Sequence, residues 1–237
     1  MPELSIGNLV TFDASVQSVI SSLGGAYKVG LSGDGTTFAV GSDDSFAVFT
    51  ITDGGDVQVR CPKTVVPDIR GLNIGVSFDG DILVIGIGKF IQFRKYNAST
   101  SAYDVKSTID AVSSVAVSGA RFTFAEQVRR CIIATTYKIE RVVDVNDDGT
   151  YTVVPIDAQT STVEIGDISP DGTKIVTVSR ISAEIRLYSY NSQTNRFEFT
   201  SKVDTNPYGT FGTGTKVHFN KSGSNVLAFH NPKNAHF

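Results

Sequence analysis

The stretch GVSFDGDILVIGIGKFIQFRKYNAST, residues 75–100, contains apolar runs separated by turn-forming residues. Its first run ends in Ser77-Phe78-Asp79-Gly80. There Gly accepts a positive φ and Asp can bond its own backbone, so a tight turn is expected. The next run, ILVIGIG at 82–88, is apolar throughout, which is typical of a strand buried on both faces. The residues after it alternate, as a partly exposed strand does.

The same arrangement recurs along the chain. Copies read VGLSGDGTTFAVGS from Val29, IGVSFDGDILVIGI from Ile74, GDISPDGTKIVTVS from Gly166 and VHFNKSGSNVLAFH from Val217, with a degenerate copy, VAVSGA, from Val115. The residues before the turns, which we call anchors, are Ser32, Ser77, Ser118, Ser169 and Asn220. Their spacings of 45, 41, 51 and 51 residues fall within the range of propeller-blade repeats. Each copy predicts a blade in which strands a and b flank the turn and a c–d hairpin follows.

Five a–b pairs are present, but only four c–d pairs follow them. Residues 7–22, GNLVTFDASVQSVISS, are predicted to form strand c, a tight turn and strand d, which would complete the blade begun at the C-terminus. The prediction is an all-β, five-bladed β-propeller of four-stranded antiparallel blades, one domain over residues 1–237, closed without open sheet edges. A larger propeller cut short at Phe237 and a β-sandwich are the alternatives.

The pattern resembles WD40-like and FG-GAP-like β-propeller repeats over about residues 5–237. The resemblance rests on its S-x-DG turns and on polar hairpins that contain Tyr-Asn, at 96–97 and 190–191. The Gly-His and Trp-Asp marks of WD40 repeats are missing, and the chain has no Trp. The resemblance implies the architecture. It does not imply one activity, because propellers carry many functions.

The composition narrows the classes of function. A chain of 237 residues with 41% hydrophobic residues can bury a core and is too apolar for disorder. A net charge of −3 argues against general binding of nucleic acid or anionic membranes, and no apolar run is long enough for a membrane helix. Without a signal-peptide pattern, a cytoplasmic or virion-associated location is expected. No cofactor is expected, and Cys61 and Cys131 are predicted to be reduced thiols.

Small residues are expected on innermost strands, where the chain crowds the axis. The residues two positions before the anchors are Gly30, Gly75, Ala116, Asp167 and His218. Asp167 and His218 break this rule in adjacent blades, and a neighbouring carboxylate favours a charged imidazole. We predict a hydrogen-bonded pair that links the two blades, with a catalytic or binding dyad near the channel as the alternative.

Two loops are candidate binding surfaces. In the third copy, residues 119–130, GARFTFAEQVRR, form an insertion that offers Arg121, Phe122, Phe124, Arg129 and Arg130. Aromatic residues with arginine are typical of contact surfaces and could also stack single-stranded nucleic acid. Long d–a connections are expected at 61–71 and 201–214, and the second places Tyr208 and Phe211 in a Gly-rich loop. The d–a face is favoured as the binding face, with the insertion on the opposite face.

DVNDDG, residues 144–149, matches the first half of a calcium loop. Pro155 stands where the distal carboxylate would be, so a c–d hairpin turn without a metal is predicted. FG-GAP-like proteins carry calcium loops in hairpins, and the resemblance keeps that alternative open.

The leading functional hypothesis is a non-enzymatic recognition module that presents loops to a protein or glycan partner, and the loop composition would suit a viral or phage surface protein. The alternatives are a five-bladed glycoside-processing enzyme and a nucleic-acid-binding propeller. A glycosidase needs two converging carboxylates, and only Asp167 is expected on an inner strand.

Overall fold

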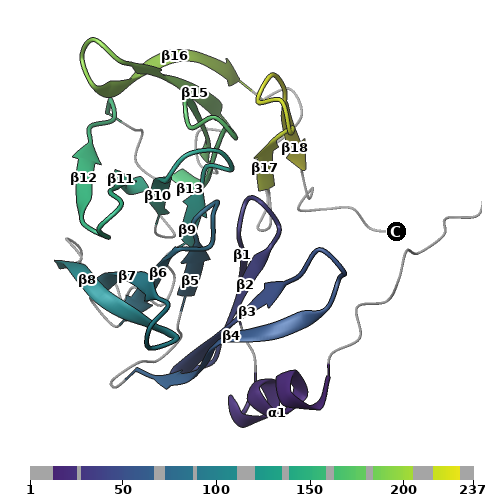
Figure 1. The fold of residues 1–237 in the computed structure, drawn as a ribbon. Coiled ribbons are helices and arrows are strands. Elements are labelled where there is room, and N and C mark those ends of the chain that lie inside the picture. Colours follow the sequence, from purple (N-terminus) through teal and green to yellow (C-terminus); the bar gives the residue numbers. More distant parts are fainter. Residues whose placement is uncertain are drawn as a thin grey trace, which may run out of the picture.

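The computed structural model describes residues 13–25, 28–66, 73–87, 90–110, 121–134, 139–158, 163–179, 184–204 and 216–229. Within these ranges the chain forms eighteen strands and one helix, α1 (Ala14–Ser22). The strands make five antiparallel sheets, which we number blade 1 to blade 5 in chain order. Figure 1 shows the five blades gathered around a common centre.

In blades 1 to 4, four strands pair in chain order. Blade 1 contains β1 (Lys28–Leu31), β2 (Thr37–Gly41), β3 (Ser45–Ile51) and β4 (Val57–Val65). Blade 2 contains β5 (Asn73–Val76), β6 (Ile82–Ile87), β7 (Phe90–Asn97) and β8 (Ala102–Asp110). Blade 3 contains β9 (Arg121–Phe124), β10 (Arg130–Ala134), β11 (Ile139–Val145) and β12 (Tyr151–Val154). Blade 4 contains β13 (Val163–Ile168), β14 (Lys174–Ser179), β15 (Glu184–Asn191) and β16 (Arg196–Asp204). Blade 5, as far as it is described, contains β17 (Lys216–Phe219) and β18 (Val226–Phe229).

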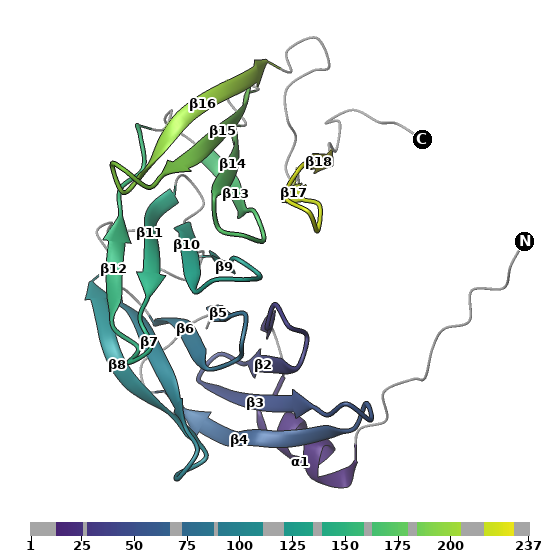
Figure 2. The same ribbon diagram turned by 45° about the horizontal axis from the view of Figure 1, so that its top comes forward.

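The first strand of each blade lies innermost, and in the complete blades the fourth lies outermost (Figure 2). The inner strands β1, β5, β9, β13 and β17 contact one another in succession around the axis. An all-β, propeller-like arrangement is therefore present.

The Ser-x-Asp-Gly turn joins the first two strands of a blade through its own hydrogen bonds. The buried Ser77 hydroxyl donates to Asp79 Oδ1 at 2.6 Å and accepts from the Ile82 amide at 2.9 Å. Gly80 has φ +72°, a conformation that favours glycine. The turns at Ser32 and Ser169 repeat these bonds. The recurring motif thus closes the a–b turn.

Neighbouring blades are joined by apolar side chains and by their turns. Between blades 1 and 2, Phe46 and Val48 pack with Leu83 and Ile85 in one buried cluster. Similar clusters lie between blades 2 and 3 and between blades 3 and 4. The turns also touch directly, because the Asp34 amide donates to the Phe78 carbonyl at 2.9 Å.

The placement of the third copy was wrong. The anchor predicted at Ser118 lies outside the described residues, and blade 3 takes its first strand from 121–124. The Ala125 amide donates to the Arg130 carbonyl at 2.9 Å, the same five-residue closure as Ser77 to Ile82 in blade 2. Ala125 is therefore the structural anchor, although its turn lacks the Ser, Asp and Gly signals.

The N-terminal hairpin was also predicted wrongly, because residues 14–22 form a helix instead of a strand. Asp13 caps the helix by accepting from the Val16 amide at 2.9 Å. The apolar side of α1 packs on Val40 and Phe49 of blade 1. Residues 7–12 of the predicted hairpin lie outside the described residues.

Candidate functional site

An open cavity of about 480 Å³ lies where the inner strands meet. Its walls include Val29 and Leu31 of β1, Phe122 and Phe124 of β9, Asp167 of β13 and His218 of β17. Val29 and Leu31 are 68% and 60% exposed. The cavity therefore combines accessible apolar walls with a few polar groups, among them the pair Asp167 and His218, which is the usual make-up of a ligand site.

Asp167 and His218 come from adjacent blades and face each other. His218 Nδ1 lies 3.6 Å from Asp167 Oδ2, and the Phe219 amide donates to the same oxygen at 2.8 Å. The Asp167 side chain is 13% exposed and that of His218 is 58% exposed. Burial raises the pKa of Asp167, although the Phe219 amide and His218 act in the opposite direction.

The cavity is also lined by first-turn residues, namely Ser32, Glu126 and Pro170. These turns belong to the a–b face, so the cavity reaches the face that carries the a–b turns. From Tyr208 and Phe211 we had expected binding at the opposite face, which carries the d–a connections. Both aromatic residues lie outside the described residues. The first predicted d–a connection, 61–71, is shorter than expected because β4 continues to Val65.

Phe122 and Phe124 lie on the inner strand β9 and not in an inserted loop. The backbone of Arg121 belongs to the same strand. Their half-buried rings pack with the cluster between blades 2 and 3. A Cβ added at Gly75 would lie 2.7 Å from Phe122 Cβ, so the glycine permits β5 and β9 to approach. The predicted contact loop at 119–130 is corrected accordingly, and the two rings are wall residues of the cavity.

Two of the three arginines in the predicted insertion, Arg129 and Arg130, bind carboxylates of the protein. Arg130 Nε donates to Asp144 Oδ1 at 2.6 Å, and its guanidinium lies 3.9 Å from the centre of the Tyr190 ring. Arg129 Nε donates to Asp79 Oδ2 at 2.9 Å. Both side chains therefore join neighbouring blades, Arg129 to blade 2 and Arg130 to blade 4.

The turn at 144–149 directs its carboxylates to protein donors. Asp144 binds Arg130, and Asp148 Oδ1 accepts from the Thr150 amide at 2.8 Å. Among the described residues, no group of three or more His, Cys, Asp or Glu side chains is placed to hold a metal ion.

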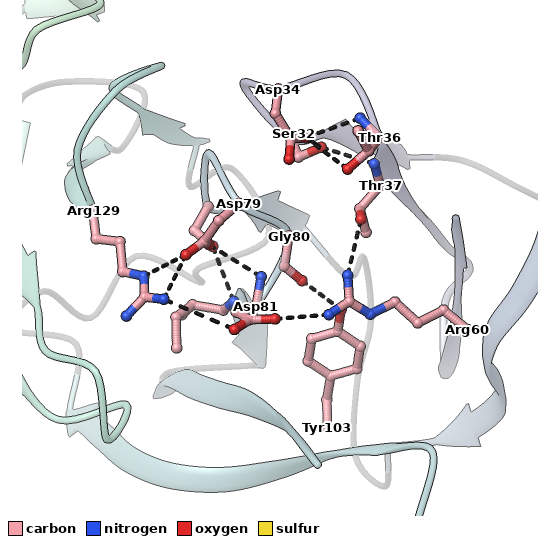
Figure 3. Close-up of polar contacts among 12 residues, drawn as sticks. Ser32, Asp34, Thr36, Thr37, Arg60, Asp79, Gly80, Asp81, Tyr103 and Arg129 are labelled. Carbon is pink, nitrogen blue, oxygen red and sulfur yellow. Dashed lines mark hydrogen bonds and ion pairs between the residues drawn. The ribbon is translucent and has the colours of Figure 1, made fainter. Parts of the chain in front are cut away.

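A polar network between blades 1, 2 and 3 was missed by sequence reasoning (Figure 3). Arg60 donates to Asp81 at 2.7 Å and to the Thr37 hydroxyl at 3.0 Å, while Arg129 reaches Asp79. The Tyr103 hydroxyl donates to the Gly80 carbonyl at 2.6 Å. Asp79 and Asp81 at the turn could have indicated such a network, but their arginine partners lie 50 and 21 positions away in the sequence.

In the ranges that the structure describes, α1 is too short to cross a membrane, and no other helix is present that could do so.

Comparisons with known proteins support the fold. No family model matches the chain, and no curated protein matches it. A solved protein from Lactobacillus plantarum is 16% identical with a TM-score of 0.59, over 86% of this chain and 63% of that one. Saccharomyces cerevisiae Sqt1 is 10% identical with a TM-score of 0.55, over 75% and 48%.

A putative 6-phosphogluconolactonase from Bacteroides uniformis is 17% identical with a TM-score of 0.53, over 76% of this chain and 55% of that one. The chain therefore spans about half to two thirds of the length of these structures. Together with the four-stranded antiparallel sheets, the likenesses define a β-propeller-like protein. At these identities they concern the fold alone.

Proposed function

We propose that this chain is a non-enzymatic recognition module, a five-bladed propeller that binds a segment of a partner protein at the axial cavity. A lysine or arginine side chain of the partner enters the cavity and pairs with Asp167. The observation that carries the proposal is the largely buried Asp167 carboxylate in an open cavity with apolar walls.

The charges around the cavity support a cationic group. Its described lining residues include the acidic Asp167 and Glu126 and no lysine or arginine. Burial raises the pKa of Asp167, so the ionised form is held at a cost that a bound cation relieves. The exposed Val29 and Leu31 supply surface for the aliphatic part of such a side chain.

A library of capped hexapeptides tests this proposal, with Lys, Arg, Ala or Glu at a central position. Lys or Arg should be selected, and Asp167→Asn should weaken binding at least about tenfold, as expected for a bond to a charged group. Asp53→Asn, at an exposed turn of blade 1, is the matched control and should bind as the wild type does. Selection of Glu, or glycan-array binding that Asp167→Asn leaves unchanged, would contradict the proposal.

A hydrolytic enzyme is the second candidate, supported by the imidazole of His218 beside a carboxylate, as in a base and its orienting group. The Bacteroides neighbour is itself named as a lactonase. The described walls hold no cation that would bind a sugar phosphate, which disfavours that substrate. Glycosides and neutral lactones are the appropriate probes. We expect the wild-type protein to turn over none of these probes. Turnover by the wild type that is lost in His218→Ala would establish the enzyme.

A further inference from the structure

The imidazole of His218 faces the carboxylate to which the proposed function assigns a bound cation. Its Nδ1 lies 3.6 Å from Asp167 Oδ2, a distance longer than a hydrogen bond. The neutral ring therefore leaves the charge of Asp167 available to a ligand. A protonated ring would instead bring a positive charge to the position that a lysine or arginine of the partner has to reach.

The two side chains differ in their access to solvent. Both line the axial cavity, but the side chain of His218 is exposed and that of Asp167 is largely buried. The imidazole can therefore take up a proton directly from water. A movement of less than about 1 Å would then bring Nδ1 within hydrogen-bond distance of Oδ2, because 3.0 Å is a normal length for such a bond.

Other charged groups lie on the elements around His218. Its strand β17 pairs with β18, which places Leu227 opposite the ring, and packs on β13 and β14 of blade 4 (Figure 2). The Lys174 amine of β14 donates to the Gly223 carbonyl at 3.3 Å. Apart from the pair, the titratable residues of these strands and of the described cavity wall are Glu126, Glu164, Lys174 and Lys216. Glutamate and lysine ordinarily titrate near about pH 4.3 and 10.4, and imidazole near about pH 6.5.

We propose that protonation of His218 regulates the axial cavity, because the charged imidazole pairs with Asp167 and takes the place of the partner's lysine or arginine. This regulation rests on the proposed function, to which it adds a dependence on pH. The imidazolium and the partner's cation compete for one carboxylate. Binding therefore releases a proton from the ring, and by linkage a fall in pH releases the partner.

Two groups of the pair can weaken binding as the pH falls. Competition by a single proton at an imidazole lowers the affinity about tenfold between pH 7.5 and pH 5.5. Burial also raises the pKa of Asp167, and protonation of this carboxyl would remove the charge that the ligand binds. His218→Gln separates the two causes, because glutamine keeps a polar side chain that has no charge at either pH.

Titration calorimetry at pH 7.5 and pH 5.5 tests the proposal, with a capped hexapeptide that has lysine at a central position. The affinity of the wild-type protein should be about tenfold lower at pH 5.5, whereas that of His218→Gln should change less than about twofold. Glu126→Gln, which removes the other acidic residue of the cavity wall, should keep the tenfold ratio. Equal ratios in the wild type and His218→Gln, or loss of the ratio in Glu126→Gln, would overturn the proposal.

A second comparison at pH 7.5 alone reproduces the charged state. His218→Lys carries a permanent charge and should bind the same peptide about tenfold or more weakly than His218→Gln, which has a neutral side chain of similar length. Equal affinities would overturn the proposal, and this comparison decides if the protein unfolds at pH 5.5. Failure of the wild type to bind the peptide at pH 7.5 would overturn the proposed function and this regulation together. Binding at pH 7.5 without the expected ratio would overturn the regulation alone.

Discussion

Arg129, in the first turn of blade 3, donates through Nε to Asp79 in the first turn of blade 2, at 2.9 Å. The same carboxylate accepts from Ser77 within its own turn. Asp79 therefore stabilises both the turn and the contact between two blades. The residue that makes the repeat recognisable in the sequence is also a residue that holds the repeats together.

The pH dependence of stability should reveal Asp79. Burial disfavours its charged form, but the bonds from Arg129 and Ser77 outweigh burial and hold the pKa below its ordinary value. A carboxyl with a lowered folded-state pKa stabilises the protein above the unfolded value, about 3.9, and this stability is lost as the pH falls through the folded value. Asp79→Asn should flatten the free energy of unfolding below about pH 4, measured by urea titration. Equal slopes in the wild type and in Asp79→Asn would contradict the assignment.

The buried serine of the turn should contribute more to the free energy of unfolding than an exposed serine does. Ser77→Ala removes the bond to Asp79 and leaves the Ile82 amide without its acceptor. The expected loss is about 1–3 kcal/mol of unfolding free energy. Ser222→Ala, in the corresponding turn of blade 5, removes an exposed hydroxyl and should cost less than about 0.5 kcal/mol. Chemical denaturation of both variants provides the comparison, and similar losses would refute it.

Alanine substitutions at two glycines can distinguish the stability cost of a strained backbone from the cost of a steric clash. Gly35 and Gly80 have φ of +74° and +72°, so alanine should cost about 1–2 kcal/mol at either position. A Cβ at Gly35 meets no atom within 4 Å, whereas one at Gly80 would lie 2.6 Å from Thr37 Cβ in blade 1. Gly80→Ala should therefore lose about 1–3 kcal/mol more than Gly35→Ala. Equal denaturant midpoints for the two variants would show that the blades do not meet there.

Asp167→Asn should weaken peptide binding and increase the stability of the folded protein at neutral pH. Burial raises the pKa of Asp167, so its contribution to stability is complete below about pH 3.9 and declines as the pH rises through the folded value. The neutral amide should accordingly make the protein more stable than the wild type at pH 7, but not at pH 3. It should weaken the cationic peptides of the proposed function. A melting temperature unchanged at both pH values would argue against a buried charge.

Four of the five blades were predictable because their turns carry local chemistry. Ser32, Ser77 and Ser169 bond an Asp two positions on, and Asn220 accepts from two amides of its own turn. The first strand of blade 3 was predicted wrongly because its turn at Ala125 is held by backbone hydrogen bonds and by packing. Such a turn leaves no signature in residue types, and the nearby Ser118 resembled an anchor.

The helix α1 was predictable from signals that the repeat pattern obscured. Asp13 is a favourable cap, and Val16, Val19, Ile20 and Leu23 have the spacing of one helical face. Their β-branched members suggested strands. The Asp167–His218 contact depends on two positions 51 residues apart, and the repeat register was correct for both blades. The cavity around them depends on the third blade, where the register was wrong.

Because α1 and blade 1 are contiguous in the sequence, the first blade has a cover for its outer face before the rest of the chain exists. Val40 and Phe49 are buried against α1 by residues that precede them on the growing polypeptide. The order of synthesis and the order of burial therefore coincide. Blade 1 can therefore bury this face without waiting for any later blade.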